Sequence, residues 1–570
     1  MSATPHTFGP GLFGWYHAPK GPPRGRGVVL VPAFGYDALC VHRAWAALAD
    51  ALAAVGLPVL RFDLAGTGDG AGDDEEAERT AARASSVGTA IDHLEAISGV
   101  EQVCLVGLRL GALLAVRAAA GRPDVESLAL LAPVAAGRLY VRELKALAMT
   151  APPLPGAPAP VPEHAQDLEA AGFVLTAPTL AALATLDVAS LGTRPAPRAL
   201  VLHRPDLPQD QKLLKALAAL QVEASSEAFD GYVELMRDAH FSVTPAAAWA
   251  QVAAFAAQGA PAGTPRTAQL TTAWDVPGAR EEAVQFGDGL FGVLTSPRQG
   301  ASGKAVLVLN TGSNPHVGAN RMSVQLARRL AARGLTTLRF DVGGMGDSAE
   351  RPGPPEQRLY SKASCSDVKA ALDFLAAKGF ARATGVGLCS GAYLAFHTAI
   401  EDERLEALVL INAQRFSWRE GDSLEIAMRK SFKSTRFYVQ QFFRAETWDR
   451  VRKGEVNVRG VAGVLVSRGA ARLQSKAKDL LARLSSGGSD GDATDVARGF
   501  FHVLGRGVRV LLVYSAQDGG LDELDTHLGA QGKKLQGKGD VTIELFEGAD
   551  HTLTPRWARA RLFERLDGWL

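Results

Sequence analysis

A cysteine stands between two glycines at residues 387–391, where the sequence reads Gly-Leu-Cys-Ser-Gly. Small and apolar residues precede this run and a helix-compatible run follows it, so the sequence predicts a strand, a tight turn and a helix. Flanking glycines let the backbone fold closely around the central residue and present its side chain clear of a sheet. Cys389 is therefore the candidate nucleophile, because a frame centred on Ser390 would place leucine and alanine where glycines are needed.

This pattern resembles the nucleophile elbow of the α/β-hydrolase superfamily, with Cys389 at the position that serine usually holds. In that superfamily, elbow cysteines occur in polyhydroxyalkanoate synthases, which are acyltransferases, and in dienelactone-hydrolase-like enzymes, which are hydrolases. The resemblance is confined to the elbow and to the order of the residues that follow it. It implies an acyl-enzyme mechanism and a chain order of nucleophile, acid and histidine.

The resemblance implies that an acid and a histidine follow Cys389, each after a strand. Residues 508–514 form a Val/Leu-rich run, and Asp518 follows it in the turn Ser-Ala-Gln-Asp-Gly, with Asp522 as a second candidate. Another strand-like run precedes Gly-Ala-Asp-His, which ends at His551. The expected triad is Cys389, His551 and Asp518, in which His551 is the base and Asp518 orients it.

An oxyanion hole is expected from backbone N–H groups aimed at the substrate carbonyl oxygen. One is the amide of Ser390, and the other comes from the loop at residues 310–314, which reads Asn-Thr-Gly-Ser-Asn after an apolar run. Thr311 and Gly312 are the two candidates in this loop, and the sequence does not decide between them.

A thiolate at such a turn would attack an ester or thioester and form an acyl-cysteine. Water as the acceptor would make the protein a thioesterase-like or esterase-like hydrolase. Another acceptor would make it an acyltransferase or cyclase. An alternative of another class is a non-catalytic binding or scaffold protein, in which Cys389 would be unreactive. The residues leave these alternatives open.

Three motifs recur in the same order and reveal an internal repeat. Phe-Gly-x-Gly-Leu-Phe-Gly at residues 8–14 returns at 286–292, and Leu-Arg-Phe-Asp at 60–63 returns at 338–341, in both cases 278 residues later. The turn Gly-Leu-Arg-Leu-Gly at 107–111 returns as the cysteine turn 280 residues later. The chain is therefore predicted to hold two tandem copies of one fold.

The first copy has Arg109 at the apex of its turn, and a guanidinium cannot act as a nucleophile because it stays protonated. Asp206 follows a strand-like run and matches Asp518, while His240 matches His551. We expect a degenerate, pseudo-enzyme domain in which Arg109 pairs with Asp206. The alternative is that Arg109 holds an anionic ligand, as a regulatory or carrier site.

Two further pairs of positions recur near the predicted active face. Asp63 and Asp341 end the second matched strand of each copy, and each is followed by a Gly-rich turn. We expect these carboxylates to brace the turns rather than to act in catalysis. The dipeptides His-Arg at 42–43 and Asn-Arg at 320–321 occupy equal positions in the two copies and are interpreted as structural.

In each copy, apolar strand-like runs alternate with helical patterns. The strand runs are Val/Leu-rich without polar alternation, which is typical of strands covered on both faces. This β-α-β alternation predicts a mostly parallel sheet with helices on both sides and functional loops at the carboxyl ends of the strands. The expected fold class is α/β, with two tandem α/β-hydrolase folds that each carry a cap insertion.

The boundary between the copies is expected in a Pro/Gly-rich stretch that begins near residue 258. The expected division is a degenerate α/β-hydrolase-like domain at 1–258, a linker at 259–281, and a catalytic domain at 282–570 with a cap at about 414–505. Within the cap, residues 415–483 hold sixteen Lys/Arg against seven Asp/Glu. This charge suits a small acyl ester or thioester carried by CoA or an acyl carrier protein, although a lid with a solvated basic face is the alternative.

The composition is typical of a soluble globular protein, with 47% hydrophobic and 21% charged residues, and the net charge of +1 gives no field that attracts nucleic acid. Four cysteines are too few for a disulfide framework, and no CxxC spacing, P-loop or GxGxxG occurs, so we expect no metal and no cofactor. The N-terminus does not resemble a signal peptide and no apolar run reaches ~18 residues. We therefore expect a cytoplasmic enzyme without a membrane span.

Overall fold

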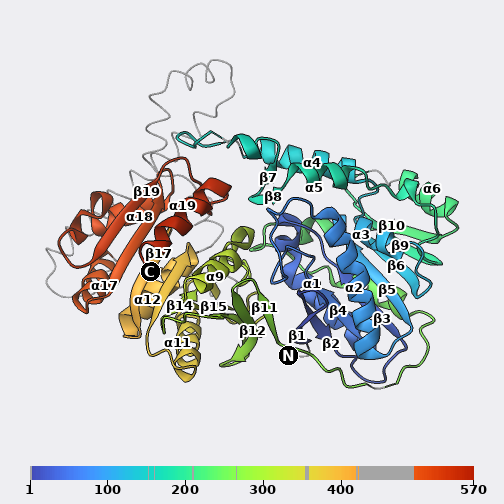
Figure 1. Cartoon of the computed structure of the whole chain (residues 1–570), viewed down its shortest axis with the longest axis horizontal. Helices are drawn as coiled ribbons and strands as arrows, with labels where there is room; N and C mark the ends of the chain where they lie inside the picture. Colours follow the sequence, from blue (N-terminus) through green and yellow to red (C-terminus); the bar gives the residue numbers. More distant parts are fainter. Residues whose placement is uncertain are drawn as a thin grey trace, which may run out of the picture. The chain divides into compact units, whose positions relative to one another are not determined.

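The computed structural model describes residues 3–151, 153–159, 161–207, 211–264, 266–352, 358–418, 422 and 493–570. It contains two large β-sheets with helices packed along them (Figure 1). Contacts between Cα atoms divide the chain into two compact units. The first unit holds residues 1–152, 159–302 and 313–350, and the second holds residues 153–158, 303–312 and 351–570.

The first sheet has eight strands in the order β1-β2-β4-β3-β5-β6-β9-β10. Their bounds are β1 Ala3–Phe8, β2 Leu12–His17, β3 Arg26–Val31, β4 Val59–Phe62, β5 Gln102–Leu108, β6 Val125–Leu131, β9 Arg198–His203 and β10 Glu223–Ala228. Strands β1, β2 and β4 pair antiparallel, and the remaining neighbours pair in parallel. A small hairpin, β7 (Leu168–Ala170) and β8 (Phe173–Leu175), lies outside this sheet.

Helices cover both faces of the first sheet. Alternate residues of β3 point to opposite cores: Val28 and Leu30 pack with α1 and α8, whereas Val29 and Val31 pack with α2 and α3. This burial on both faces explains why the strands carry no polar alternation. The helices are α1 (Tyr36–Ala54), α2 (Thr80–Ser98), α3 (Leu110–Ala119), α4 (Gly137–Met149), α5 (Ala177–Ala184), α6 (Gln211–Ala219), α7 (Tyr232–Leu235) and α8 (Ala246–Ala257).

The second sheet has nine strands in the order β11-β12-β13-β15-β14-β16-β17-β18-β19. Their bounds are β11 Ala273–Val276, β12 Ala279–Phe286, β13 Leu290–Pro297, β14 Ala305–Val308, β15 Thr336–Asp341, β16 Ala383–Leu388, β17 Leu405–Ile411, β18 Arg509–Ser515 and β19 Val541–Phe546. Without β11, this is the order of the first sheet. The predicted α/β class and the two tandem α/β-hydrolase folds are therefore confirmed.

The antiparallel part of the second sheet belongs to the first unit. Strands β11, β12, β13 and β15 pair antiparallel, and helix α9 (Met322–Ala332) packs beside them. Aromatic side chains of β2, Phe13 and Trp15, form one buried cluster with Trp274 of β11 and Phe291 of β13. This cluster is a core that the first sheet shares with the start of the second copy.

The parallel part of the second sheet positions the candidate site and belongs to the second unit. Strands β16, β17, β18 and β19 pair in parallel, and β14 pairs with β16. Helix α12 packs on β16 and β17, and α11 and α17 pack on α12. The helices are α11 (Lys362–Ala377), α12 (Ser390–Glu401), α17 (Ala493–Gly505), α18 (Gly520–Leu528) and α19 (Arg556–Asp567).

The expected linker at 259–281 is only partly irregular, because it contains β11 and the start of β12. Most of the cap expected at about 414–505, including nearly all of its basic and aromatic run, lies outside the described residues. Helix α17 is the described end of that segment. Among the described residues, no helix is both long and apolar enough to cross a membrane.

Candidate active site

Cys389 lies at the turn between β16 and α12, in a strained backbone conformation with φ 57° and ψ −113°. Its amide donates to the carbonyl of Ile411 at 2.9 Å, which ties the turn to β17. A Cβ on Gly387 would overlap the carbonyl group of Gly391. A Cβ on Gly391 would press on the carbonyl oxygen of Asn310. Both glycines are thus required for the backbone to close around Cys389.

His551 and Asp518 lie beside this turn, in loops that follow β19 and β18. The His551 Nδ1 donates to Asp518 Oδ2 at 2.6 Å. The Asp518 side chain is fully buried, and that of His551 is 15% exposed. Burial opposes protonation of His551, but the charges of Asp518 and Cys389, and hydrogen bonds to both, outweigh it and hold the pKa of the imidazole well above its usual value. The imidazole therefore contacts the Asp518 carboxylate and is influenced by the charge of Cys389.

The acid loop holds Asp518 in one orientation. Its Oδ1 accepts the amide of Gly520 at 2.7 Å while its Oδ2 faces His551. Asp522, the second candidate, lies in the first turn of α18, and its amide donates to the carbonyl of Gly519 at 3.1 Å. Of the two carboxylates, Asp518 is the one that contacts His551.

Asn412 fixes the loops that carry His551 and Asp518, and its role was not predicted from the sequence. It follows β17 with φ 45°. Its Nδ2 donates to the carbonyl of His551 at 2.7 Å and to Ser515 Oγ at 3.0 Å, and its Oδ1 accepts the amide of Ser515 at 2.7 Å. A polar residue directly after a buried strand was the available signal.

Tyr360 is a second side chain at the site that sequence reasoning missed. Its hydroxyl lies 3.9 Å from Cys389 Sγ. Its ring stacks on Trp418 with centroids 4.6 Å apart and meets Tyr393 edge to face. Burial, and then the neighbouring Cys389, raise the pKa of the Tyr360 hydroxyl well above its usual value, so it remains a neutral donor. The thiol therefore lies against an aromatic wall.

The residues expected at the oxyanion hole lie close to the cysteine turn. Ser390 is the first residue of α12 and is buried. The amide of Gly312 donates to the Ser390 hydroxyl at 2.9 Å. Thr311, the preceding residue, is also buried. The Gly312 amide is thus engaged by a side chain.

The first copy keeps the shape of the turn without its chemistry. Arg109 has φ 56° and ψ −117°, almost the backbone geometry of Cys389. The expected pairing of Arg109 with Asp206 is wrong: Arg109 pairs with Asp37 at 3.4 Å and with Glu143. These two carboxylates come from α1 and α4, which sequence spacing could not place beside the turn.

The other two counterparts in the first copy are also separated. Asp206 pairs with Arg204 at 2.6 Å. The Nδ1 of His240 lies 2.7 Å from the hydroxyl of Ser313. The contact that joins His551 to Asp518 therefore has no equivalent between His240 and Asp206 in the described chain.

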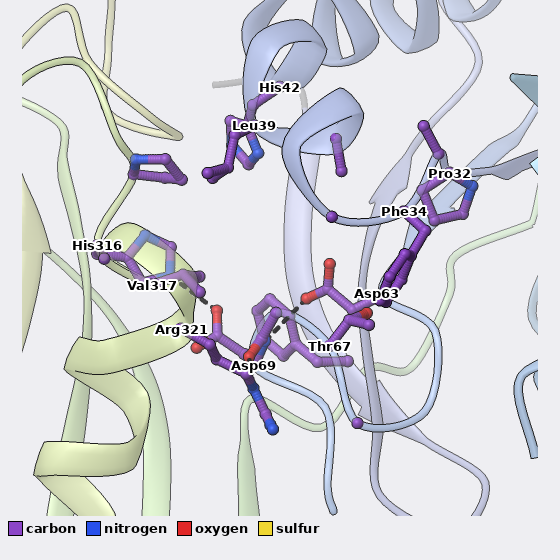
Figure 2. Close-up of a pocket in the computed structure, with 18 of the residues that line it drawn as sticks. Pro32, Phe34, Leu39, His42, Asp63, Thr67, Asp69, His316, Val317 and Arg321 are labelled. Atoms are coloured by element: carbon purple, nitrogen blue, oxygen red, sulfur yellow. Dashed lines mark hydrogen bonds and ion pairs between the residues drawn. The ribbon is translucent and has the colours of Figure 1, made fainter. Parts of the chain in front are cut away.

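A cavity of about 100 Å³ lies in the first unit, beside the loop that follows β3 (Figure 2). Its walls include the aromatic rings of Phe13, Trp15, Phe34 and Phe173, and Asp63 lies on its polar side. Asp63 Oδ2 accepts the amide of Asp69 at 3.0 Å, so this carboxylate braces its turn as expected.

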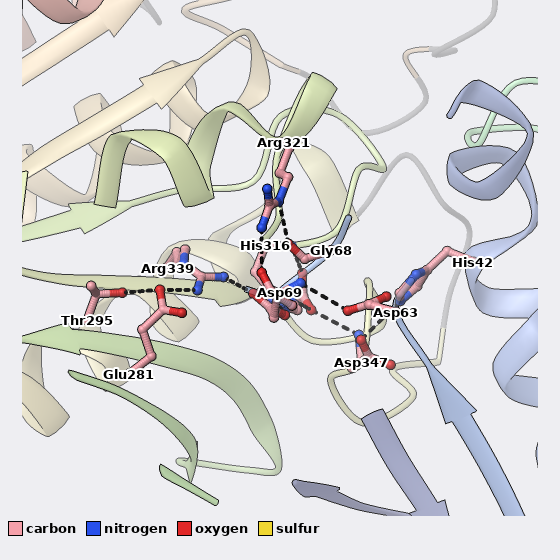
Figure 3. Close-up of polar contacts among 12 residues, drawn as sticks. His42, Asp63, Gly68, Asp69, Glu281, Thr295, His316, Arg321, Arg339 and Asp347 are labelled. Atoms are coloured by element: carbon pink, nitrogen blue, oxygen red, sulfur yellow. Dashed lines mark hydrogen bonds and ion pairs between the residues drawn. The ribbon is translucent and has the colours of Figure 1, made fainter. Parts of the chain in front are cut away.

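A buried polar network borders this cavity (Figure 3). His316 donates from Nδ1 to Asp341 at 2.8 Å and from Nε2 to Asp69 at 2.7 Å. Burial opposes the charge on His316, but Asp341 and Asp69 raise its pKa to about 10. Arg339 pairs with Asp69, and with Glu281 at 3.0 Å.

The same network contains the repeat-equivalent ion pair, in which the arginine comes from the first copy and the aspartate from the second. Arg61 pairs with Asp347 at 2.6 Å, and His42 donates to the same carboxylate at 3.0 Å. In the described chain, His316, Asp341 and Asp347 form a group whose ligand atoms lie within 4.8 Å of one another. Ion pairs and hydrogen bonds already engage these atoms, so the group is electrically balanced by protein side chains.

Comparison with known proteins matches both copies to hydrolases. A family model described as serine aminopeptidase, S33, matches residues 41–170, and one described as alpha/beta hydrolase family matches residues 312–564. The uncharacterized protein YcjY of Escherichia coli (strain K12) is 29% identical over 90 residues. That match covers 15% of this chain and 28% of YcjY, so the chain matches little more than a quarter of this curated relative.

Two solved structures that match this chain each cover about half of it. The dienelactone hydrolase from Anabaena variabilis is 14% identical and covers 51% of this chain and 97% of its own, with a TM-score of 0.31. Est1E from Butyrivibrio proteoclasticus is 15% identical and covers 45% of this chain and 97% of its own, with a TM-score of 0.33. The family models and the two matching sheets together assign this chain to the α/β-hydrolase superfamily.

Proposed function

We propose that the second copy is an acyl-processing hydrolase that works through an acyl-cysteine on Cys389, with His551 as its base and Asp518 as the acid that orients the base. The observation that carries this proposal is the 2.6 Å contact between His551 and Asp518, together with the strained elbow at Cys389, whose charge helps to raise the pKa of the same imidazole. A nucleophile, a base and an orienting acid in contact are the minimum that covalent acyl transfer requires.

In the acylation step, the Cys389 thiolate attacks the carbonyl carbon of an ester or thioester and forms a C–S bond. The carbonyl oxygen becomes an oxyanion, which the amides of Ser390 and Thr311 would stabilise. Thr311 is favoured over Gly312 because the Gly312 amide donates to the Ser390 hydroxyl. The tetrahedral intermediate then expels the alcohol or thiol, which leaves with the proton of the His551 imidazolium.

In the deacylation step, neutral His551 removes a proton from water, and the hydroxide attacks the acyl-cysteine. The C–S bond breaks, the carboxylic acid is released, and the thiolate returns beside a protonated His551. Tyr360 stays neutral and lies 3.9 Å from Sγ, where its hydroxyl can stabilise the thiolate between turnovers. No metal or cofactor takes part in either step.

Transfer of the acyl group to another acceptor, including CoA or an acyl carrier protein, uses the same first step. The basic segment that suggested such a partner lies outside the described residues, so hydrolysis remains the leading proposal. Product analysis with and without an amine or alcohol acceptor separates the two, because a transferase forms an amide or ester at the expense of free acid. All four cysteines are free, which suits a reducing compartment such as the cytoplasm.

Alkylation by iodoacetamide tests whether Cys389 is a nucleophile or part of a non-catalytic scaffold. A raised pKa keeps His551 charged above pH 6.5, where it favours the neighbouring thiolate. We expect iodoacetamide to alkylate Cys389 at about pH 7 at least about tenfold faster in the unchanged protein than in His551→Ala, which lacks the charged imidazole.

The other three cysteines are buried and should react slowly, and peptide mass shows which cysteine carries the label. Equal alkylation rates of Cys389 in the unchanged protein and in His551→Ala would support the scaffold alternative and reject the proposed nucleophile.

A further inference from the structure

The two repeat copies treat their turn-bracing aspartates differently. Asp341 in the second copy accepts both the backbone amide of His316, at 2.6 Å, and its ring Nδ1, at 2.8 Å. Asp63 occupies the same repeat position, and residue 38, the counterpart of His316, is alanine. In the first copy that stretch forms the first turn of α1, so no imidazole from this position reaches Asp63. Ala38 and Asp63 instead line the cavity of the first unit.

Three other carboxylates border this cavity: Asp74 accepts the amide of Val174 at 3.3 Å, and the other two are compensated by ion pairs. Asp69 is paired with Arg339 and His316, and Asp347 with Arg61 and His42. Asp69 and Asp347 therefore each have two basic partners.

Asp63 accepts the Asp69 amide and forms no ion pair in the described ranges. Burial, and then the charge of Asp69, raise the pKa of Asp63 to about 6. Arg61 and His42 lower the pKa of Asp63, but both are paired with Asp347. At neutral pH Asp63 is therefore a carboxylate without an ion pair of its own on the wall of a cavity.

Four basic side chains also line the cavity, and each is engaged by protein carboxylates or carbonyl groups: His42, Arg61, His316 and Arg321. The remaining walls suit an apolar and aromatic body. Phe13, Trp15, Phe34 and Phe173 contribute rings. Figure 2 shows the Asp63 carboxylate facing the space between Phe34, Leu39 and His42. Asp63 and Ala38 are both only half-buried, so neither is fully covered by other side chains. Rings around a carboxylate favour a cation with an attached ring, because a carboxylate and π faces both attract positive charge.

We propose that this cavity is a binding site for a small organic cation, an ammonium group on a compact aromatic or aliphatic body, which pairs with Asp63 as the His316 imidazole pairs with Asp341. The site is separate from Cys389 and does not depend on the proposed hydrolase activity. It gives the degenerate copy a ligand-binding role, although its own elbow carries an arginine.

Calorimetric titration of the full-length protein at about pH 8 tests this site, since Asp63 and an alkyl ammonium are both charged there. The probes are benzylamine, its neutral analogue benzyl alcohol and its anionic analogue benzoate. We expect benzylamine to bind at least about tenfold more tightly than benzyl alcohol, because a charge-assisted hydrogen bond is lost with the alcohol. Benzoate should not bind.

Three variants complete the test. Asp63→Asn removes the charge and should weaken benzylamine binding about tenfold or more. Ala38→Leu fills the cavity from a helical position and should abolish binding of both benzylamine and benzyl alcohol, and it serves if Asp63→Asn does not fold. Asp230→Asn removes an exposed carboxylate of the same unit and should leave binding unchanged.

Equal affinity for benzylamine and benzyl alcohol, unchanged benzylamine binding in Asp63→Asn or in Ala38→Leu, or no binding of benzylamine to the unchanged protein would each overturn the proposal.

Discussion

The apex residue separates the two copies at the scale of single residues. The backbone φ is 57° at Cys389 and 56° at Arg109. For a residue with a side chain, this conformation costs of order 1–3 kcal/mol of conformational free energy. The first copy keeps this strain although its apex is no nucleophile. The strained turn is therefore a property of how the glycines pack against neighbouring backbone, and the chemistry resides in the side chain and its partners.

Asp518→Asn tests the orienting acid. The amide keeps the shape but cannot hold a charged imidazole, so the acylation rate should fall about 10³–10⁴-fold with little change in substrate binding. Asp522→Asn is the matched control and should leave the rate unchanged. Stopped-flow measurement of leaving-group release checks both. A larger loss in Asp522→Asn than in Asp518→Asn would contradict the assignment of the acid.

Strand ends decide the geometry at the scale of elements. Asn412 follows β17 and binds Ser515 at the end of β18 and the His551 loop after β19. The repeat counterpart in the first copy is Ala132, which keeps the positive φ of 42° but has no amide to hold neighbouring loops. The loss of this tie accompanies the separation of His240 from Asp206.

Asn412→Ala should reduce kcat about 10- to 100-fold while KM stays unchanged, because the substitution moves the base rather than the binding surface. Asn412→Asp keeps the acceptor for the Ser515 amide and should recover part of the loss. Steady-state kinetics per folded molecule, with folding checked by circular dichroism, provides the measurement. A rise in KM with constant kcat would show that Asn412 does not act as a positioning residue.

At the scale of the whole molecule, two equivalent ion pairs between the repeat copies link the parts of the first unit. Arg61 pairs with Asp347, and Arg339 pairs with Asp69. The two arginines are 278 residues apart in the sequence, and so are the two aspartates. Each copy thus gives an arginine to an aspartate of the other, which is the reciprocity expected of a two-fold interface. Here both partners belong to one chain.

Arg339→Met should destabilise the protein strongly, because it leaves Asp69 and Glu281 buried with reduced compensation. Breaking such a buried pair costs about 3–5 kcal/mol. Arg298→Met, which removes an exposed ion pair with Asp275, is the matched control and should cost less than about 1 kcal/mol. Urea denaturation followed by tryptophan fluorescence measures both. Similar stabilities of the two variants would show that the buried network does not hold this unit together.

Local signals in the sequence predicted much of this molecule. The glycines at 387 and 391, the strand runs and the repeat spacing all act over a few residues or recur at a fixed interval, so the fold, the elbow and the positions of His551 and Asp518 could be predicted. The short strand β11 also had a signal, a Pro-Gly turn at 277–278, that the linker interpretation overlooked.

Contacts between distant elements could not be predicted in the same way. Arg109 meets Glu143 of α4 and Asp37 of α1 rather than Asp206, and Tyr360 meets Cys389 from the segment before α11. Spacing along the chain carries no information on which helix end approaches which turn. The cavity beside Asp63 likewise depends on a local change of backbone between copies that the repeat motifs hide.

The most direct test of the central claim is the intact mass of the protein after exposure to a panel of acyl thioesters. We expect the unchanged protein to gain the mass of one acyl group and Cys389→Ala to gain none. Decay of this adduct in water would identify a hydrolase, and persistence until an acceptor is added would identify a transferase. An adduct of equal size on Cys389→Ala would contradict an acyl-cysteine mechanism. So would the absence of any adduct on an unchanged protein whose Cys389 is alkylated no faster than in His551→Ala.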